Sequence, residues 1–134
     1  MDETRIRNAI ATYVAAWNEH DPERRARLIA EACAEDLRIV APGLLVRGRA
    51  ELEALIADFH RRRAGDRGRL SSEVEVHGGV FRFAAKIEGS TVVPPIEMLD
   101  VGECAEDGRI RLVFSFVGAA PPAVRSDLPA ERAT

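Results

Sequence analysis

The sequence has few residues of four types: cysteine and histidine, which often form metal or redox sites, and tryptophan and tyrosine. Its 134 residues include two cysteines, three histidines, one tryptophan and one tyrosine. Cys33 and Cys104 are far apart along the chain, and no histidine stands at metal-ligand spacing from a group of carboxylates. We therefore expect reduced cysteines that serve only in packing, and no metal site.

An excess of one charge and long apolar runs are also missing. The 19 basic and 22 acidic side chains give a net charge of −3, which provides no field to hold a phosphate backbone, so a nucleic-acid partner is not favoured. No apolar run is long enough to cross a membrane, and the first residues lack the basic-then-apolar order of an export signal. The expectation is a soluble cytoplasmic protein with no membrane partner.

The composition that remains is that of one globular domain. With 46% hydrophobic and 31% charged residues, the chain can bury one substantial core and is too short for two ordinary ones. We expect this single domain over residues 1–118. Residues 119–134 contain three prolines and no apolar periodicity, which predicts a disordered tail.

Apolar spacing predicts three helices in the first half of the chain. The apolar residues that share one face of the first helix are Ile6, Ile10, Tyr13, Val14 and Trp17. Asp21 followed by Pro22 is typical of a helix start, so a second helix is expected over residues 22–34. A third begins near Arg49 and ends at Gly65.

Most of the remaining sequence alternates with a period of two. The expected strands run over residues 37–41, 74–77, 80–87, 92–104 and 110–117. In the last strand, alternation places one set of residues on a single face, namely Ile110, Leu112, Phe114 and Phe116. Pro94 and Pro95 predict a bulge or an edge. Three helices on one face of a curling antiparallel sheet make an α+β fold.

Five short stretches of the sequence form a recognisable set, namely Tyr13-Val14-Ala15-Ala16-Trp17-Asn18, Asp21-Pro22, Val46-Arg47-Gly48-Arg49, Leu99-Asp100-Val101 and Asp107-Gly108-Arg109-Ile110. In these stretches the chain resembles the nuclear transport factor 2-like superfamily. Within that superfamily the chain most resembles the SnoaL-like polyketide cyclase group and its relative ketosteroid isomerase, over roughly residues 3–118. The resemblance implies a cone-shaped, cystatin-like α+β barrel in which a curved antiparallel sheet packs against three N-terminal helices around an apolar cavity.

The resemblance also implies two catalytic residues. Tyr13 matches the tyrosine that donates a hydrogen bond to the substrate oxygen in ketosteroid isomerase. Asp100 matches the strand acid of that oxyanion site and the acid/base aspartate of SnoaL-like cyclases. Where the isomerase has its proton-shuttling aspartate before a proline, this chain has Ala41-Pro42. Asp100 is then left as the acid or base, Tyr13 as the hydrogen-bond donor, and no cofactor is expected.

An apolar wall around Asp100 is expected to raise the pKa of its carboxyl group. The residues expected to line this substrate pocket are Trp17, Phe59, Phe81, Phe83, Met98, Phe114 and Phe116.

Each of the main candidate residues could also have a purely structural role. Tyr13 and Trp17 suit a core as well as a site, and Asp100 could pair with Arg82 or Arg111.

Three functions stay open. The first is a cofactor-free cyclase, isomerase or dehydratase that acts on a carbonyl compound through Asp100. The second is a non-catalytic binder of an apolar small molecule, which Ala41 favours. The third is a homodimeric assembly module, because members of the superfamily often dimerise through the outer sheet face, which here is expected to carry Val101, Val113 and Val117.

A basic segment follows the third helix. It comprises His60-Arg61-Arg62-Arg63, with Arg67 and Arg69 a few residues further on. It could bind phosphate, but cations at the end of a helix also complement the negative pole of the helix dipole. We interpret this segment as a solvated helix end.

Overall fold

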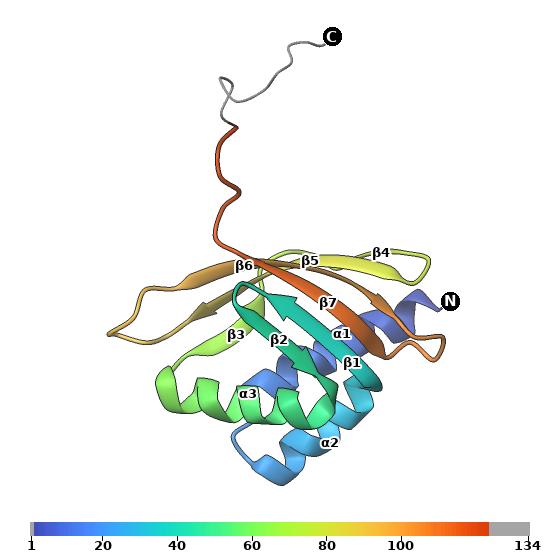
Figure 1. Cartoon of the computed structure of the whole chain (residues 1–134), viewed down its shortest axis with the longest axis horizontal. Helices are drawn as coiled ribbons and strands as arrows, with labels where there is room; N and C mark the ends of the chain where they lie inside the picture. The colour runs from blue at the N-terminus through green and yellow to red at the C-terminus, as the bar shows by residue number, and fades with distance from the viewer. Residues whose placement is uncertain (1, 124–134) are drawn as a thin grey trace.

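In the computed structural model, which describes residues 2–123, three helices pack against one seven-stranded curved sheet (Figure 1). In chain order the elements are α1 (Glu3–Asn18), α2 (Pro22–Ala32), β1 (Cys33–Ala41), β2 (Leu44–Arg47), α3 (Gly48–Arg62), β3 (Arg67–Leu70), β4 (Glu75–His77), β5 (Val80–Glu88), β6 (Ile96–Cys104) and β7 (Ile110–Val117). The α+β class is therefore confirmed. Of the expected tail, residues 124–134 lie outside the described residues.

Aspartate side chains cap the first two helices, and the start of α2 is the one that the sequence predicts. The Asp2 carboxylate accepts a hydrogen bond from the Thr4 backbone N–H at 2.9 Å and caps α1. The Asp21 carboxylate caps α2 in the same way, with Pro22 at the first helical position. The second helix ends at Ala32, earlier than expected, because the chain there enters β1. No helix within residues 2–123 is long and apolar enough to cross a membrane.

The sheet is mixed, whereas an antiparallel one was expected. Its strand order is β2-β1-β7-β6-β5-β3, with β4 also paired to β5, and the first and last strands of this order do not close on each other. Every pair is antiparallel except β1 with β7, which is parallel. The edge strands β2 and β3 have four residues each and were not predicted, because such short segments show no resolvable alternation.

A β-bulge interrupts the alternation of β7 near its start. Ile110 pairs with Cys104, and the next pair joins Leu112 to Glu103, so Arg111 is an extra residue without a partner on β6. Such an insertion moves every later side chain of the strand to the opposite face of the sheet. The two halves of β7 therefore follow different alternation patterns.

Because of the bulge, the later side chains of β7 face the opposite side of the sheet from the one expected. Beyond it, Val113 is 1% exposed and packs in the core, whereas Phe114 and Phe116 are 42% and 60% exposed on the outer face of the sheet. Val117 pairs with Met98 on the inner face. The expectations that Phe114 and Phe116 point inward, and that Val113 and Val117 point outward, are therefore wrong.

The core lies between the inner face of the sheet and the helices. Its largest fully buried side chains are Phe81, Ile6, Ile10, Ile29, Leu37, Leu52, Ile56 and Ile110. The first helix packs against β3, β4 and β7, and α3 packs against β1 and β2. The core thus fills one end of the curved sheet, and the space nearer the C-terminal half of α1 is left for a cavity.

Candidate functional site

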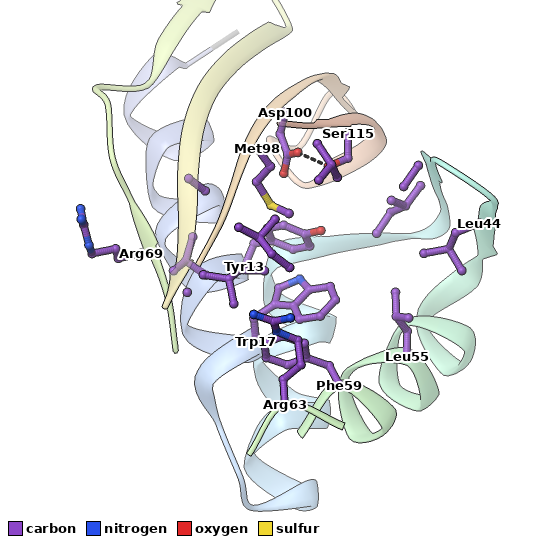
Figure 2. A pocket seen from close by; sticks show the side chains of 18 of the residues that line it. Tyr13, Trp17, Leu44, Leu55, Phe59, Arg63, Arg69, Met98, Asp100 and Ser115 are labelled. Carbon is purple, nitrogen blue, oxygen red and sulfur yellow. Dashed lines mark hydrogen bonds between the residues drawn. The ribbon is translucent and has the colours of Figure 1, made fainter. Parts of the chain in front are cut away.

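The concave side of the sheet holds a cavity of about 490 Å³ (Figure 2). Helices α1 and α3 and strands β1, β5, β6 and β7 all contribute to its wall. The side chains that define it include Tyr13, Val14, Trp17, Ile39, Ala41, Leu44, Leu55, Phe59, Phe83, Ala85, Ile87, Ile96, Met98, Asp100, Ser115 and Val117. Such a largely apolar pocket with a few polar groups is the usual form of a small-molecule site.

Asp100 lies in a row of three directly opposed residues across the sheet. It pairs with Phe83 of β5 on one side and with Ser115 of β7 on the other. The side chain is 5% exposed, and the Ser115 hydroxyl donates a hydrogen bond to its Oδ1 atom at 2.6 Å. Asp100 therefore has its carboxylate on the cavity wall with one oxygen anchored, as Figure 2 shows.

The structural interpretation of Asp100 as an arginine partner is wrong. Arg82 bonds to Glu75, and Arg111 pairs with Asp36, both on the outer side of the sheet. Within residues 2–123, no basic side chain forms an ion pair with Asp100. The burial of this carboxylate is therefore uncompensated by a cation, which is uncommon for an acid that serves only to stabilise a fold.

Burial governs the pKa values of the two polar groups in the cavity. It raises the pKa of Asp100 to about 6, and the hydrogen bond from Ser115 moderates this rise. Burial also raises the pKa of Tyr13 well above its usual value, and the nearby negative charge of Asp100 raises it further. Asp100 can thus gain or lose a proton near neutral pH, while Tyr13 keeps its proton and remains a donor.

The Tyr13 side chain comes from the face of α1 that meets the cavity. Its ring is 6% exposed and packs edge-on against Trp17, with the ring centroids 6.4 Å apart. Figure 2 shows its hydroxyl pointing into the cavity below the Asp100 carboxylate. No group within residues 2–123 accepts a hydrogen bond from this hydroxyl, so its proton is available to a ligand.

Four of the seven expected pocket residues line the cavity, namely Trp17, Phe59, Phe83 and Met98. The rings of Trp17 and Phe59 pack edge to face with centroids 5.5 Å apart. Three do not line it. Phe81 is 1% exposed in the core beside Gly102, and Phe114 and Phe116 lie on the outer face because of the bulge.

A buried ionic network holds the α1 wall of the cavity against α3. Arg25 is 4% exposed, bonds to Glu53 at 2.8 Å and donates to the Glu19 carbonyl at 2.8 Å. It also contacts His60, whose Nε2 atom lies 2.7 Å from the Trp17 carbonyl oxygen. These contacts fix the backbone that carries Trp17.

Two cavity residues, Ala41 and Ser115, determine which proton-transfer and hydrogen-bonding groups are present in the cavity. Ala41, with Pro42, lines the cavity, so a methyl group faces the space in which the resemblance implies a base. Ser115 was missed because simple alternation from Ile110 assigns it to the outer face; only knowledge of the bulge would have revealed it.

Groups that could hold a metal are not found in the part of the chain that the structure describes. No three His, Cys, Asp or Glu side chains within residues 2–123 gather into a possible metal site. Cys33 and Cys104 are both buried free thiols. Around Asp100 the polar groups on the cavity wall are therefore its own carboxyl group and the hydroxyl groups of Tyr13 and Ser115.

Neither a family model nor a curated protein matches this sequence. A solved structure does: a candidate isomerase of the SnoaL-like family from Agrobacterium tumefaciens shares 31% identity, with 87% of this chain and 99% of that chain covered and a TM-score of 0.78. This chain therefore belongs to the SnoaL-like family.

More distant structures have the same fold. A candidate ketosteroid isomerase from Kribbella flavida shares 18% identity over 93% of this chain and 87% of that chain, with a TM-score of 0.66. A protein with a cystatin-like fold from Methylobium petroleophilum shares 15% identity over 92% of this chain and 81% of that chain, with a TM-score of 0.75. At these identities the likeness of the two structures to this chain is one of fold.

Proposed function

We propose that this SnoaL-like protein is a cofactor-independent enzyme that moves a proton next to the carbonyl group of a small apolar compound, as an isomerase, cyclase or dehydratase. One observation carries the proposal: a buried carboxylate and a buried phenol face the same apolar cavity, and in the described part of the chain the first has no cationic partner and the second no hydrogen-bond acceptor. A buried acid with a raised pKa in a cleft is a typical candidate for acid/base catalysis.

In the proposed mechanism, Asp100 takes a proton from the carbon next to the carbonyl. Its Oδ1 atom is held by Ser115, so Oδ2 is the oxygen that accepts the proton. Tyr13 donates a hydrogen bond to the carbonyl oxygen, which becomes an enolate oxygen as the C–H bond breaks. The protonated Asp100 then returns the proton to another carbon, or to a leaving hydroxyl group.

Among residues 2–123, Asp100 is the only carboxylate that lines the cavity, so the reaction is limited to one carboxyl group. Because Ala41 cannot carry a proton, Asp100 must serve as both base and acid in one turnover. A pKa of about 6 suits both roles near neutral pH. Ala41 also supports the alternative, in which the cavity binds an apolar ligand without changing it.

Deuterium exchange separates these two functions. 2-Tetralone has acidic hydrogens next to its carbonyl, and NMR in D₂O follows their exchange. We expect the protein to accelerate this exchange, Asp100→Asn to abolish the acceleration, and Tyr13→Phe to reduce it about a hundredfold.

Binding provides the control for this experiment. Trp17 is the one tryptophan of the chain and lines the cavity, so its fluorescence reports on occupancy. We expect Asp100→Asn to bind decan-2-one as tightly as the unmodified protein. Tight binding of this ketone without any exchange above buffer, for either ketone, would contradict the enzyme and favour the binder.

We also propose that the protein forms a homodimer through the outer face of its sheet. Phe114 and Phe116 are exposed there, and Leu99 and Leu45 are 38% and 44% exposed. Val101 is directly opposite Phe114 on β6 and shares this face. A contiguous apolar surface of this kind on a soluble domain is typical of an interface.

A further inference from the structure

Apart from Asp100, the charged residues that line the cavity are all arginines. They are Arg62 and Arg63 at the end of α3, and Arg69 of β3. In Figure 2 the Arg69 side chain points away from the cavity, whereas Arg63 lies beside Trp17, on the side away from Asp100. The cavity therefore has a carboxylate at one end and a guanidinium group at the other.

The acidic partners of these arginines lie outside the cavity wall. Arg63 donates to Asp66 at 2.6 Å, and Arg62 to Asp58 at 2.6 Å, yet neither aspartate lines the cavity. Each ion pair thus presents its positive member to the cavity. Because Asp58 also pairs with Arg61, this one carboxylate is shared between two cations.

Arg63 has hydrogen-bond donors to spare, although its side chain is only 13% exposed. Its Nε atom donates to Asp66, and its Nη2 atom donates to the Pro94 carbonyl at 3.0 Å. No residue within 2–123 accepts a hydrogen bond from Nη1. A desolvated guanidinium with free N–H groups binds an oxyanion more strongly than an exposed one does.

We infer that the substrate is an amphipathic carbonyl compound that carries an anionic group, such as a carboxylate, at the end opposite the reacting carbonyl. This inference rests on the proposed function, because it takes the Asp100 and Tyr13 end as the site of the carbonyl. The arginines bind the anion, and the apolar wall between the two ends contacts the hydrocarbon body. The orientation also keeps the anion away from the Asp100 carboxylate, which would repel it.

The arginines also have a plain structural role that must be separated from binding. Asp66 is 1% exposed in its side chain and accepts from the Ser90 backbone N–H at 2.6 Å, so the Arg63–Asp66 pair anchors the loop between β5 and β6. Loss of Arg63 alone would leave a buried, unpaired carboxylate. The test therefore needs a variant that removes both charges and another that leaves this pair intact.

Two ligands that differ only at one end make the test. Decan-2-one and 9-oxodecanoate have the same chain length and the same methyl ketone, but only the second carries a carboxylate. Their affinities are measured by Trp17 fluorescence at neutral pH. We expect 9-oxodecanoate to bind about tenfold more tightly than decan-2-one, because a charge-assisted hydrogen bond supplies roughly that factor.

Variants assign this preference to the cavity arginines. We expect Arg62→Gln and the double variant Arg63→Gln with Asp66→Asn to lose most of the preference, while the affinity for decan-2-one stays the same. Arg61→Gln is the matched control, because Arg61 shares Asp58 with Arg62 but does not line the cavity. It should keep the full preference.

Equal affinities of the unmodified protein for the two ligands would overturn the inference, as would a preference that survives in both cavity variants. Failure of the proposed function is recognised separately through Asp100→Asn. If this variant keeps both the ligand preference and the deuterium exchange, the arginine site stands and the role of Asp100 is wrong.

Discussion

The Ser115 hydroxyl donates a hydrogen bond of 2.6 Å to Oδ1 of Asp100 from the directly opposite position on the neighbouring strand. This contact fixes the carboxylate and also lowers its pKa against the effect of burial. Ser115 is therefore a positioning residue for the proposed base. It determines which oxygen is free to react and the pH range in which that oxygen is ionised.

Ser115→Ala is expected to raise the pKa of Asp100 above its value of about 6 in the unmodified protein. Without the donor, the charged carboxylate loses its one hydrogen bond within residues 2–123, and the protonated form is favoured. The side-chain carboxyl signal of Asp100 in a ¹³C NMR titration measures this directly. The pH midpoint of the 2-tetralone exchange should move to higher pH in parallel.

Ser115→Thr serves as the control because it keeps the hydroxyl and suits a strand. It should restore the pKa and the exchange profile of the unmodified protein. An Ala variant that titrates at the same pH as the unmodified protein would show that the hydrogen bond has no part in the site.

Asp100→Asn is expected to change how stability depends on pH. The Asp100 pKa rises from 3.8 to about 6 on folding, so between these pH values the unfolded chain ionises while the folded protein stays protonated. The contribution of Asp100 to stability is fully present below pH 4 and is lost as the pH rises through 6. Relative to the Asn variant, the unmodified protein should lose about 3 kcal/mol over this window.

Urea unfolding of both proteins between pH 4 and pH 8 measures this difference. The two curves should separate as the pH rises and then run parallel above pH 7. A constant difference across the whole range would mean that the Asp100 pKa is the same in the folded and unfolded states.

Gly102→Ala is expected to destabilise the fold by about 3 kcal/mol, because overpacking a tight contact forces the backbone to shift. A Cβ atom at this position would overlap the Leu112 carbonyl oxygen and lie 2.7 Å from Cζ of Phe81. Gly68→Ala is the control, since a Cβ there meets only Asn18 at 3.8 Å. Thermal unfolding should distinguish the two, and equal melting temperatures would contradict the close packing at Gly102.

Phe116→Glu is expected to convert the proposed dimer into a monomer without changing the fold. Phe116 is 60% exposed on the outer sheet face, where a pair of carboxylates at a two-fold interface would repel each other. Val92→Glu is the control, because Val92 is 87% exposed in a loop between β5 and β6. Light scattering gives the mass of each protein, and a monomeric unmodified protein would rule out the dimer.

Local signals in the sequence were sufficient for the helices and for part of the site. The cap at Asp21 acts within a few residues, so α2 begins where the Asp21-Pro22 signal predicts. Asp100 precedes the irregular part of the sheet, and a lone acid among apolar strand residues indicated its burial correctly. Tyr13 lies on the face of α1 that helical spacing assigns to the interior.

The sequence by itself determined which segments become helices and that Asp100 is buried, because these depend on spacing along one segment. Only the tertiary structure decided which side of β7 faces the cavity. The inserted Arg111 is defined by pairing with β6, and this single residue moved Phe114 and Phe116 outward and brought Ser115 to Asp100. Likewise, the fold alone brought Arg63 from an apparently solvated helix end into the cavity wall, since its burial depends on distant strands that local sequence does not report.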